Sequence, residues 1–257
     1  MSPLTALSPF ALPRPCRARV SGVPVILLMA PLAIALLVHR PLHAQSSCSS
    51  DGQRAPMALM ERFVSADCAH CWSAAETPRP SHGTVALDWI VPGTQGDDAP
   101  LSGVATREAT ERLHALGRDA PPAASTLTSR VRSASALRLR VAQGPAVNGY
   151  IGASIELRQT GALKGPVSVW LALVETIPAG VEGSPVERNL VRNVLNSAWN
   201  RPERLSKSKS NTLTDYRAMS IPAGASTARL RVIGWIEDTQ GQISVIAQTH
   251  CAAIDQR

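Results

Sequence analysis

Short apolar runs, separated by polar stretches rich in glycine and proline, recur along most of the chain. Residues 56–64 and 84–91 are apolar over nearly their whole length, which is typical of buried strands. A helix is predicted to begin near Cys68, between these strands. A second helix is predicted over residues 105–118, where apolar side chains recur at helical spacing and Gly117 supplies a suitable end. The order strand, helix, strand, helix predicts a βαβα unit with a parallel pair of strands.

The pattern changes after residue 125, where shorter runs alternate between apolar and polar residues. Glycine, proline and asparagine separate these runs, as they do in antiparallel sandwiches. Residues 184–199 interrupt the series, because their apolar positions suit one face of a helix and also suit a strand. The predicted fold class is therefore α+β, with a mainly antiparallel, β-sandwich-like region after the βαβα unit. Strands are predicted in this region within residues 136–144, 149–161, 167–175, 214–222, 228–238 and 242–250.

The first 44 residues have the pattern of an export signal. They hold four arginines and no acidic residue, and residues 23–38 are uncharged and apolar. This apolar stretch is shorter than the roughly 20 residues that a membrane-spanning helix needs, and small residues lead up to Ala44. We therefore predict a signal peptide over residues 1–44 and a periplasmic or secreted protein. An uncleaved leader would be the chain's one attachment to the membrane.

Removing the leader also changes the charge of the chain. Four of the 26 basic residues lie in the leader, which leaves 22 basic against 19 acidic residues and a net charge of +3. The remaining basic residues are scattered, and base-stacking aromatic residues are not interleaved with them. The mature chain is therefore not predicted to bind nucleic acid.

Four cysteines remain once Cys16 leaves with the leader. An even number of cysteines in an oxidising compartment indicates disulfides, and four cysteines allow three pairings. Cys68 and Cys71 are close enough in sequence to bond to each other. Cys48 and Cys251 lie near the two ends of the mature chain, and domain termini often lie close together at the surface. A structural disulfide between Cys48 and Cys251 is therefore expected.

The pair in C-A-H-C, residues 68–71, suits redox chemistry. A cysteine that opens a helix meets free backbone N–H groups and the positive end of the helix dipole, which favour thiolate over thiol. Cys68 is therefore the predicted nucleophile, exposed to solvent, with Cys71 as the more buried resolving thiol and His70 as a tuning group. The predicted function is an exported thiol–disulfide redox protein that acts on protein thiols or disulfides of the cell envelope without a cofactor.

Two other interpretations use the same cysteines. In one, Cys68 and Cys71 form an inert disulfide in a non-catalytic envelope protein that serves binding or assembly. In the other, the two thiolates bind Cu or Zn together with an imidazole, as soft ligands do. The imidazole would come from His70, His82 or His250. The metal interpretation ranks third, because a closed zinc site needs four ligands and the sequence has no second C-x-x-C.

Residues 60–76, MERFVSADCAHCWSAAE, resemble the entry motif of a secreted bacterial thioredoxin-like family of unknown function, V-E-L-F-T-S-x-x-C-x-x-C. The resemblance implies a thioredoxin-like unit over residues 45–125, followed by a β-rich C-terminal domain over residues 126–257. It also implies that the cysteine pair sits between a strand and a helix. The sequence departs from the family's pattern at Trp72, where the family has proline.

Overall fold

The computed structural model describes residues 48–132, 137–159, 165–199 and 212–251, all within one compact unit. The predicted signal peptide, residues 1–44, lies outside the described residues. Among the described residues, no helix is long and apolar enough to cross a membrane. The two α-helices of this part are short, α1 (Ala69–Trp72) and α2 (Arg107–Ala115). The described residues also contain three single turns of 3-10 helix, η1 (Gly96–Asp98), η2 (Ser102–Val104) and η3 (Thr227–Arg229).

Strands make up most of the described chain and form two sheets. The larger sheet has seven strands in the order β11-β10-β7-β8-β3-β2-β4, and the smaller has four in the order β1-β5-β6-β9. The larger sheet contains β2 (Ala58–Ser65), β3 (Thr84–Val91), β4 (Ala124–Arg130), β7 (Val167–Ile177), β8 (Arg188–Trp199), β10 (Leu230–Glu237) and β11 (Ile243–Gln248). The smaller sheet contains β1 (Cys48–Ser49), β5 (Leu137–Val147), β6 (Tyr150–Gln159) and β9 (Thr212–Ser220).

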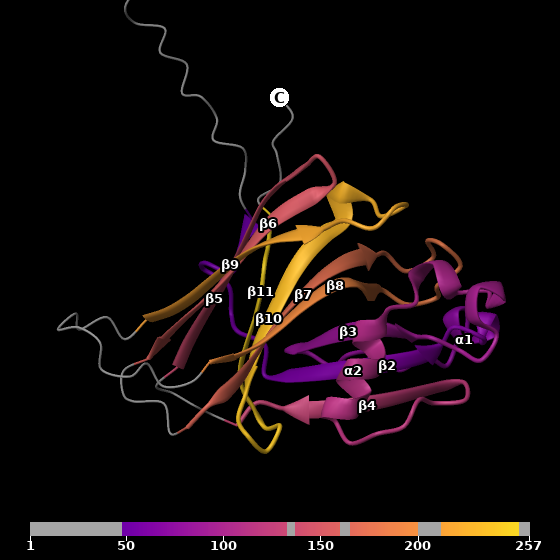
Figure 1. Cartoon of the computed structure of the whole chain (residues 1–257), viewed down its shortest axis with the longest axis horizontal. Coiled ribbons are helices and arrows are strands. Elements are labelled where there is room, and N and C mark those ends of the chain that lie inside the picture. The colour runs from indigo at the N-terminus through magenta and orange to yellow at the C-terminus, as the bar shows by residue number, and fades with distance from the viewer. Residues whose placement is uncertain (1–47, 133–136, 160–164, 200–211, 252–257) are drawn as a thin grey trace, which may run out of the picture. The chain divides into compact units, whose positions relative to one another are not determined.

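The two sheets pack against each other around an apolar core (Figure 1). In β6 every second residue from Ile151 to Leu157 is buried, so this strand turns one apolar face inward. Strand β7 is buried on both faces, which explains its nearly continuous apolar sequence. Gly234 of β10 allows the sheets to approach, because a Cβ atom there would lie 2.7 Å from Val141 Cγ1 and 2.8 Å from Ile155 Cδ1.

The predicted α+β class with a thioredoxin-like βαβα unit is wrong, because the protein is mostly β and its sheets form a sandwich-like arrangement. Helix α1 is only four residues long, so it provides no crossover helix that could cover a sheet of its own. Strands β2 and β3 do pair in parallel, but they extend the seven-stranded sheet. Their inward side chains share one apolar cluster with those of β7 and β10.

Residues 184–199, for which the sequence allowed a helix or a strand, contribute β8. This strand pairs with β7 in antiparallel fashion from Ile177–Arg188 to Val167–Trp199. Its residue Leu190 also meets Asp88 of β3 in parallel orientation. β8 therefore joins the antiparallel half of the sheet to the parallel pair β2 and β3, which flanks the cysteines in sequence.

A buried carboxylate secures the end of β7. Glu175 is fully buried, and its oxygens accept hydrogen bonds from Arg192 at 2.6 Å and from Arg229 at 2.6 Å. Burial alone would raise the pKa of Glu175, but the hydrogen bonds from Arg192 and from the Ser226 N–H, with the charges of both arginines, hold this pKa below its usual value. The ionised form is therefore the one that the fold stabilises.

We expect Glu175→Gln to lower the free energy of unfolding by about 2 kcal/mol at pH 7, because the buried guanidinium group of Arg192 loses its counter-charge. A carboxylate whose pKa falls on folding stabilises the protein above its unfolded pKa and loses that contribution as the pH falls through the folded value. The difference between wild type and variant should therefore shrink below about pH 4.3. Urea unfolding of wild type and variant from pH 3 to 7 measures this difference in stability. The control is Glu182→Gln, which changes an exposed partner of Arg229. A difference independent of pH would contradict the prediction.

Candidate thiol–disulfide site

The cysteine pair follows directly on the end of β2. The chain turns at Ala66 and Asp67, and Cys68 then occupies the position that precedes helix α1. The Cys68 N–H donates to the Ser65 carbonyl oxygen at 3.0 Å, and the Cys71 N–H donates to the Cys68 carbonyl oxygen at 3.1 Å. Cys68 and Cys71 are joined by a disulfide, with 5.4 Å between their Cα atoms. The single helical turn α1 that contains Cys71 lies beyond the ends of β2 and β3 (Figure 1).

His70 lies against both sulfurs. Its Nε2 atom is 3.4 Å from Cys68 Sγ and 3.9 Å from Cys71 Sγ, and the ring is exposed to solvent. The structure brings Cys68, His70 and Cys71 together, with one donor atom of each inside a span of 4.8 Å. His82 and His250, the alternative imidazole ligands, do not belong to this cluster. When the disulfide is opened, this placement suits proton exchange between the imidazole and the Cys68 sulfur.

The exposure of the two cysteines is the reverse of that predicted. Cys68 is 5% exposed, whereas Cys71 is only partly buried. The reason is that Cys68 lies where the chain leaves the buried strand β2, while Cys71 lies one turn farther on at the surface. The helix dipole gives less support to Cys68 than a longer helix would, because four residues form no more than one turn of aligned peptide dipoles.

Trp72 fastens this turn to the connection between β7 and β8. Its indole N–H donates to the Glu182 carbonyl oxygen at 2.8 Å. The Arg188 guanidinium lies 4.6 Å from the centre of the Trp72 ring and donates to the Trp72 carbonyl oxygen at 2.7 Å. The tryptophan that replaces the expected proline therefore has a structural role, since it joins segments 110 residues apart.

A buried ion cluster within the sheet holds the segment that follows the cysteine pair. Asp88 of β3 accepts hydrogen bonds from Arg62 of β2 at 2.7 Å and from Arg188 of β8 at 2.9 Å. Arg62 also donates to the Pro78 carbonyl oxygen, and Arg188 donates to the Thr77 hydroxyl oxygen. These contacts hold residues 72–78 on the sheet. Spacing along the sequence did not reveal this cluster, although Glu61 and Arg62 within the apolar strand β2 and Asp88 within the apolar strand β3 were a signal for buried pairing.

Asp67, the residue before Cys68, fixes the loop that follows β3. Its carboxylate accepts hydrogen bonds from the Thr94 N–H at 2.8 Å, from the Thr94 hydroxyl at 2.9 Å and from the Gln95 N–H at 3.2 Å. Desolvation would raise the pKa of Asp67, but these hydrogen bonds hold it below its usual value. Sequence reasoning did not find this residue, because its partners are 27 and 28 positions away.

Gly93→Ala should disturb this arrangement. A Cβ atom at residue 93 would lie 2.0 Å from Asp67 Oδ1, so the carboxylate would have to leave its partners at Thr94 and Gln95. We expect the free energy of unfolding to fall by about 1–3 kcal/mol, as in other overpacked sites. The control is Gly103→Ala, where no atom lies within 4 Å of the new Cβ. Equal losses of stability in urea unfolding of the two variants would contradict the role given to Asp67.

A hollow of about 260 Å³, here named the Cys71 groove, opens beside the disulfide. Cys71 and His70 line one side, and residues 123–126 at the start of the edge strand β4 line another. Arg62 and Arg188 line it as well. A molecule in the groove would therefore meet Cys71 directly, whereas Cys68 is not among the lining residues.

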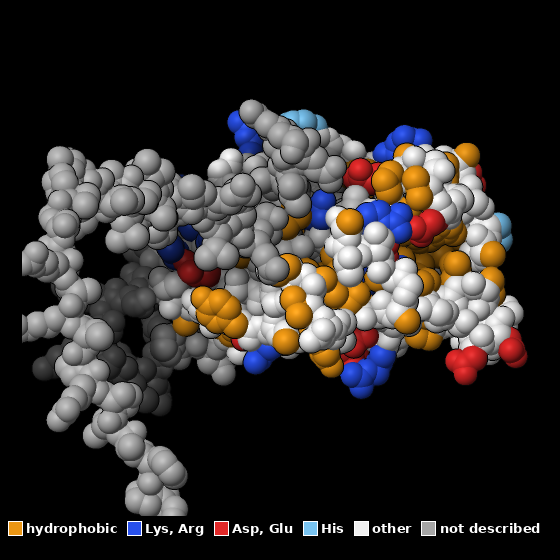
Figure 2. Space-filling model, turned by 90° about the horizontal axis from the view of Figure 1, so that it is seen from above, with side chains coloured by type: hydrophobic (Ala, Val, Ile, Leu, Met, Phe, Trp, Pro, Cys, Tyr) orange, Lys and Arg blue, Asp and Glu red, His pale blue; other side chains and the backbone are white. Residues whose placement is uncertain are grey.

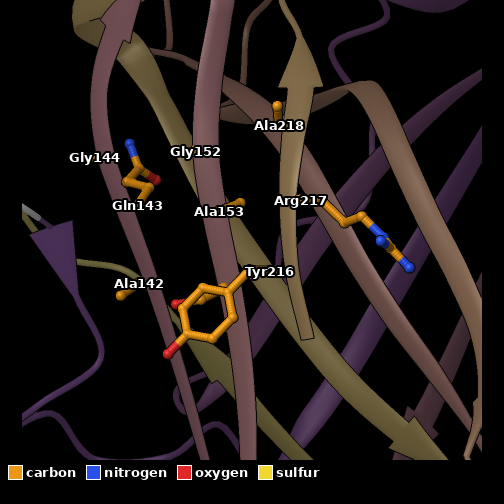
Figure 3. Close-up of a pocket in the computed structure, with 9 residues that line it drawn as sticks. Ala142, Gln143, Gly144, Gly152, Ala153, Tyr216, Arg217 and Ala218 are labelled. Atoms are coloured by element: carbon orange, nitrogen blue, oxygen red, sulfur yellow. The ribbon is translucent and has the colours of Figure 1, made fainter. Parts of the chain in front are cut away.

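A second hollow, of about 450 Å³, lies on the four-stranded sheet between β5, β6 and β9 (Figure 3). Small residues such as Gly144, Gly152 and Ala218 line it, and the Tyr216 ring stands beside them. Its lining residues include no cysteine, histidine or carboxylate. This hollow therefore has none of the groups that the chemistry at the cysteine pair requires.

Comparison with known proteins adds little to this geometry. No family model matches the chain, and no curated protein matches it. Among solved structures, HBP35 of Porphyromonas gingivalis is similar, with a TM-score of 0.48 and 10% sequence identity over 80% of this chain and 77% of that chain. A similarity this distant shows neither a shared fold nor a shared activity.

Proposed function

We propose that the protein is a thiol–disulfide redox protein whose Cys68–Cys71 bond exchanges with cysteines of other proteins. The observation that carries the proposal is the position of this bond. Its sulfurs lie against the exposed ring of His70, and Cys71 faces a groove large enough for part of a peptide chain. A disulfide that exchanges must be reached by an incoming thiolate, and the bond has this access at Cys71.

The two disulfides differ in how much they are expected to stabilise the folded protein. Cys48 and Cys251 are 203 residues apart in sequence, and their bond ties β1 to the end of the described chain. On a chain-entropy argument a bond that closes such a loop stabilises by about 5 kcal/mol, and one that closes a four-residue ring by about 2 kcal/mol. The Cys68–Cys71 bond is therefore the one that the fold can open at smaller loss of stability.

The exchange needs only the groups present in the site and a substrate with two thiols. A substrate thiolate attacks Cys71 Sγ, the bond between the sulfurs breaks, and Cys68 leaves as a thiolate that His70 can protonate. The second substrate thiolate then attacks the substrate sulfur of the mixed disulfide and releases Cys71. Two electrons and two protons pass from the substrate to the cysteine pair, so the substrate gains a disulfide and the protein gains two thiols.

The compartment and the partners follow from the same chemistry. Two disulfides indicate a protein that works outside a reducing cytoplasm, and we propose the periplasm or the extracellular medium. The proposed partners are proteins with reduced cysteine pairs. On the face shown in Figure 2, basic and acidic side chains are interspersed, which does not favour a polyanion such as nucleic acid.

Oxidation of a short peptide with two cysteines tests the proposal. For each peptide disulfide that forms, the oxidised protein should gain two thiols, both located at Cys68 and Cys71 by alkylation and mass spectrometry. The Cys48–Cys251 bond should remain intact. The double variant Cys68→Ser/Cys71→Ser is the control for oxidation by air. If wild type and control oxidise the peptide at the same rate, the protein does not perform this exchange.

A further inference from the structure

The His70 ring nitrogens lie at distances from the two cysteine sulfurs that suit a shared metal ion. His70 Nδ1 and Nε2 are 3.5 and 3.4 Å from Cys68 Sγ, and Nε2 is 3.9 Å from Cys71 Sγ. An ion bound at about 2.3 Å to sulfur and about 2.0 Å to nitrogen, in a trigonal arrangement, places a sulfur and the nitrogen about 3.7 Å apart and the two sulfurs about 4.0 Å apart. The imidazole therefore already has the spacing of a ligand, and only the two sulfurs must separate.

We propose that the reduced cysteine pair and His70 bind one monovalent copper ion, Cu(I). Two thiolates and one imidazole are a soft donor set, which selects Cu(I) among the common metal ions. Reduction of the disulfide takes up two electrons and two protons, and binding of the ion then releases the two thiol protons. The oxidised pair has no thiolate to offer, so the redox state of the pair controls binding.

The number of donors separates copper from zinc. Among the described residues, the side chains gathered at this place that could bind a metal ion are Cys68, His70 and Cys71. A closed zinc site takes four such ligands in a tetrahedron. Three donors leave a zinc ion one protein ligand short, whereas Cu(I) is held by fewer soft ligands.

The charges around the Cys71 groove also suit a monovalent ion. Arg62 and Arg188 are buried beside the groove and share the single buried carboxylate of Asp88, so these three groups carry a net charge of +1. Two thiolates with Cu(I) carry −1, whereas two thiolates with Zn(II) carry none. Glu76, the other charged residue that lines the groove, is exposed to solvent, which screens its charge. The net charge of +1 on these buried groups therefore balances the charge of −1 on the copper-bound site.

Titration under anaerobic conditions tests the site. The Cys68–Cys71 bond is opened with a phosphine reductant, the reductant is removed, and alkylation of a sample verifies that Cys48–Cys251 is intact. The protein is then titrated against the coloured Cu(I)–bicinchoninate complex. The expected result is transfer of one Cu(I) per reduced chain and none to the oxidised protein. His70→Ala should weaken binding about tenfold or more, whereas His82→Ala, at a histidine outside the cluster, should not change it.

Two results would overturn the proposal. One is that His70→Ala binds Cu(I) as tightly as wild type, with its fold verified by circular dichroism. The other is that Zn(II) added in equal amount displaces the Cu(I). The proposal depends on an opened disulfide, as the proposed function does, but here a chemical reductant opens it. Copper binding without peptide oxidation would refute the proposed function alone, and peptide oxidation without copper binding would refute the copper site alone.

Discussion

Replacing Arg112 by methionine should lower the free energy of unfolding by about 3–5 kcal/mol at neutral pH, because two buried carboxylates lose their shared counter-charge. Arg112 of α2 donates to both oxygens of Glu61 at 2.8 Å and to Glu237 at 3.0 Å. Burial alone would lower the pKa of Arg112, but Glu61 and Glu237 hold it well above its usual value, so the guanidinium stays charged. Its carbon Cζ also lies 4.8 Å from the ring centre of Trp170.

The same helix supplies the control for this change. Arg107 pairs with Glu111 at the surface and its side chain is 81% exposed, so Arg107→Met should change stability by less than about 1 kcal/mol. Neutralising both acids in the triple variant Arg112→Met/Glu61→Gln/Glu237→Gln should recover part of the loss. Urea unfolding of the four proteins provides the comparison. Equal stability of the Arg112 and Arg107 variants would show that the buried cluster does not anchor α2 to the sheet.

The two single cysteine variants should differ in how fast their remaining thiol reacts. Cys71→Ser leaves Cys68, which is 5% exposed, so we expect its reaction with a disulfide reagent to be on the order of tenfold slower than that of the other variant. Cys68→Ser leaves the accessible Cys71, which should accumulate as a mixed disulfide because no resolving thiol remains. Neither variant should oxidise a dithiol peptide through repeated cycles.

The rate of thiol modification, followed by absorbance, and the mass of the trapped adduct measure both expectations. The two variants are matched, since each has one free thiol and an intact Cys48–Cys251 bond. Faster reaction of the Cys71→Ser variant would restore the order of roles that the sequence suggested, with Cys68 as the attacking thiol. Equal rates would show that burial does not distinguish the two sulfurs.

Local patterns in the sequence predicted individual strands but not their assembly. The alternation within residues 149–161 and the apolar run of residues 167–175 correspond to β6 and β7. Which sheet receives a strand depends on pairing with distant partners, and a short apolar run carries no information about that. The predicted βαβα unit failed for this reason: the apolar side chains of β2 and β3 belong to one buried cluster with those of α2, β7 and β10, so the unit has no core of its own.

In the candidate site, too, local sequence patterns predicted some residues and not those that depend on distant partners. The C-x-x-C spacing and the histidine within it pointed to Cys68, His70 and Cys71, which lie together in the structure. The supporting residues could not be derived from spacing, since Asp88 is 26 positions from Arg62 and 100 from Arg188. The exposure of each cysteine was also misjudged, because Cys68 was expected to be exposed at the start of a helix and instead lies where the chain leaves the buried strand β2.

Equilibration of the folded protein with glutathione buffers of known potential tests the redox assignment most directly. Quenching with acid, alkylation and mass spectrometry would give the reduced fraction of each disulfide separately. We predict that Cys68–Cys71 becomes half reduced between about −270 and −120 mV, the range of thiol–disulfide oxidoreductases, while Cys48–Cys251 stays oxidised. The assignment would be contradicted if the two bonds opened together, or if Cys68–Cys71 resisted reduction to below about −300 mV, as structural disulfides do.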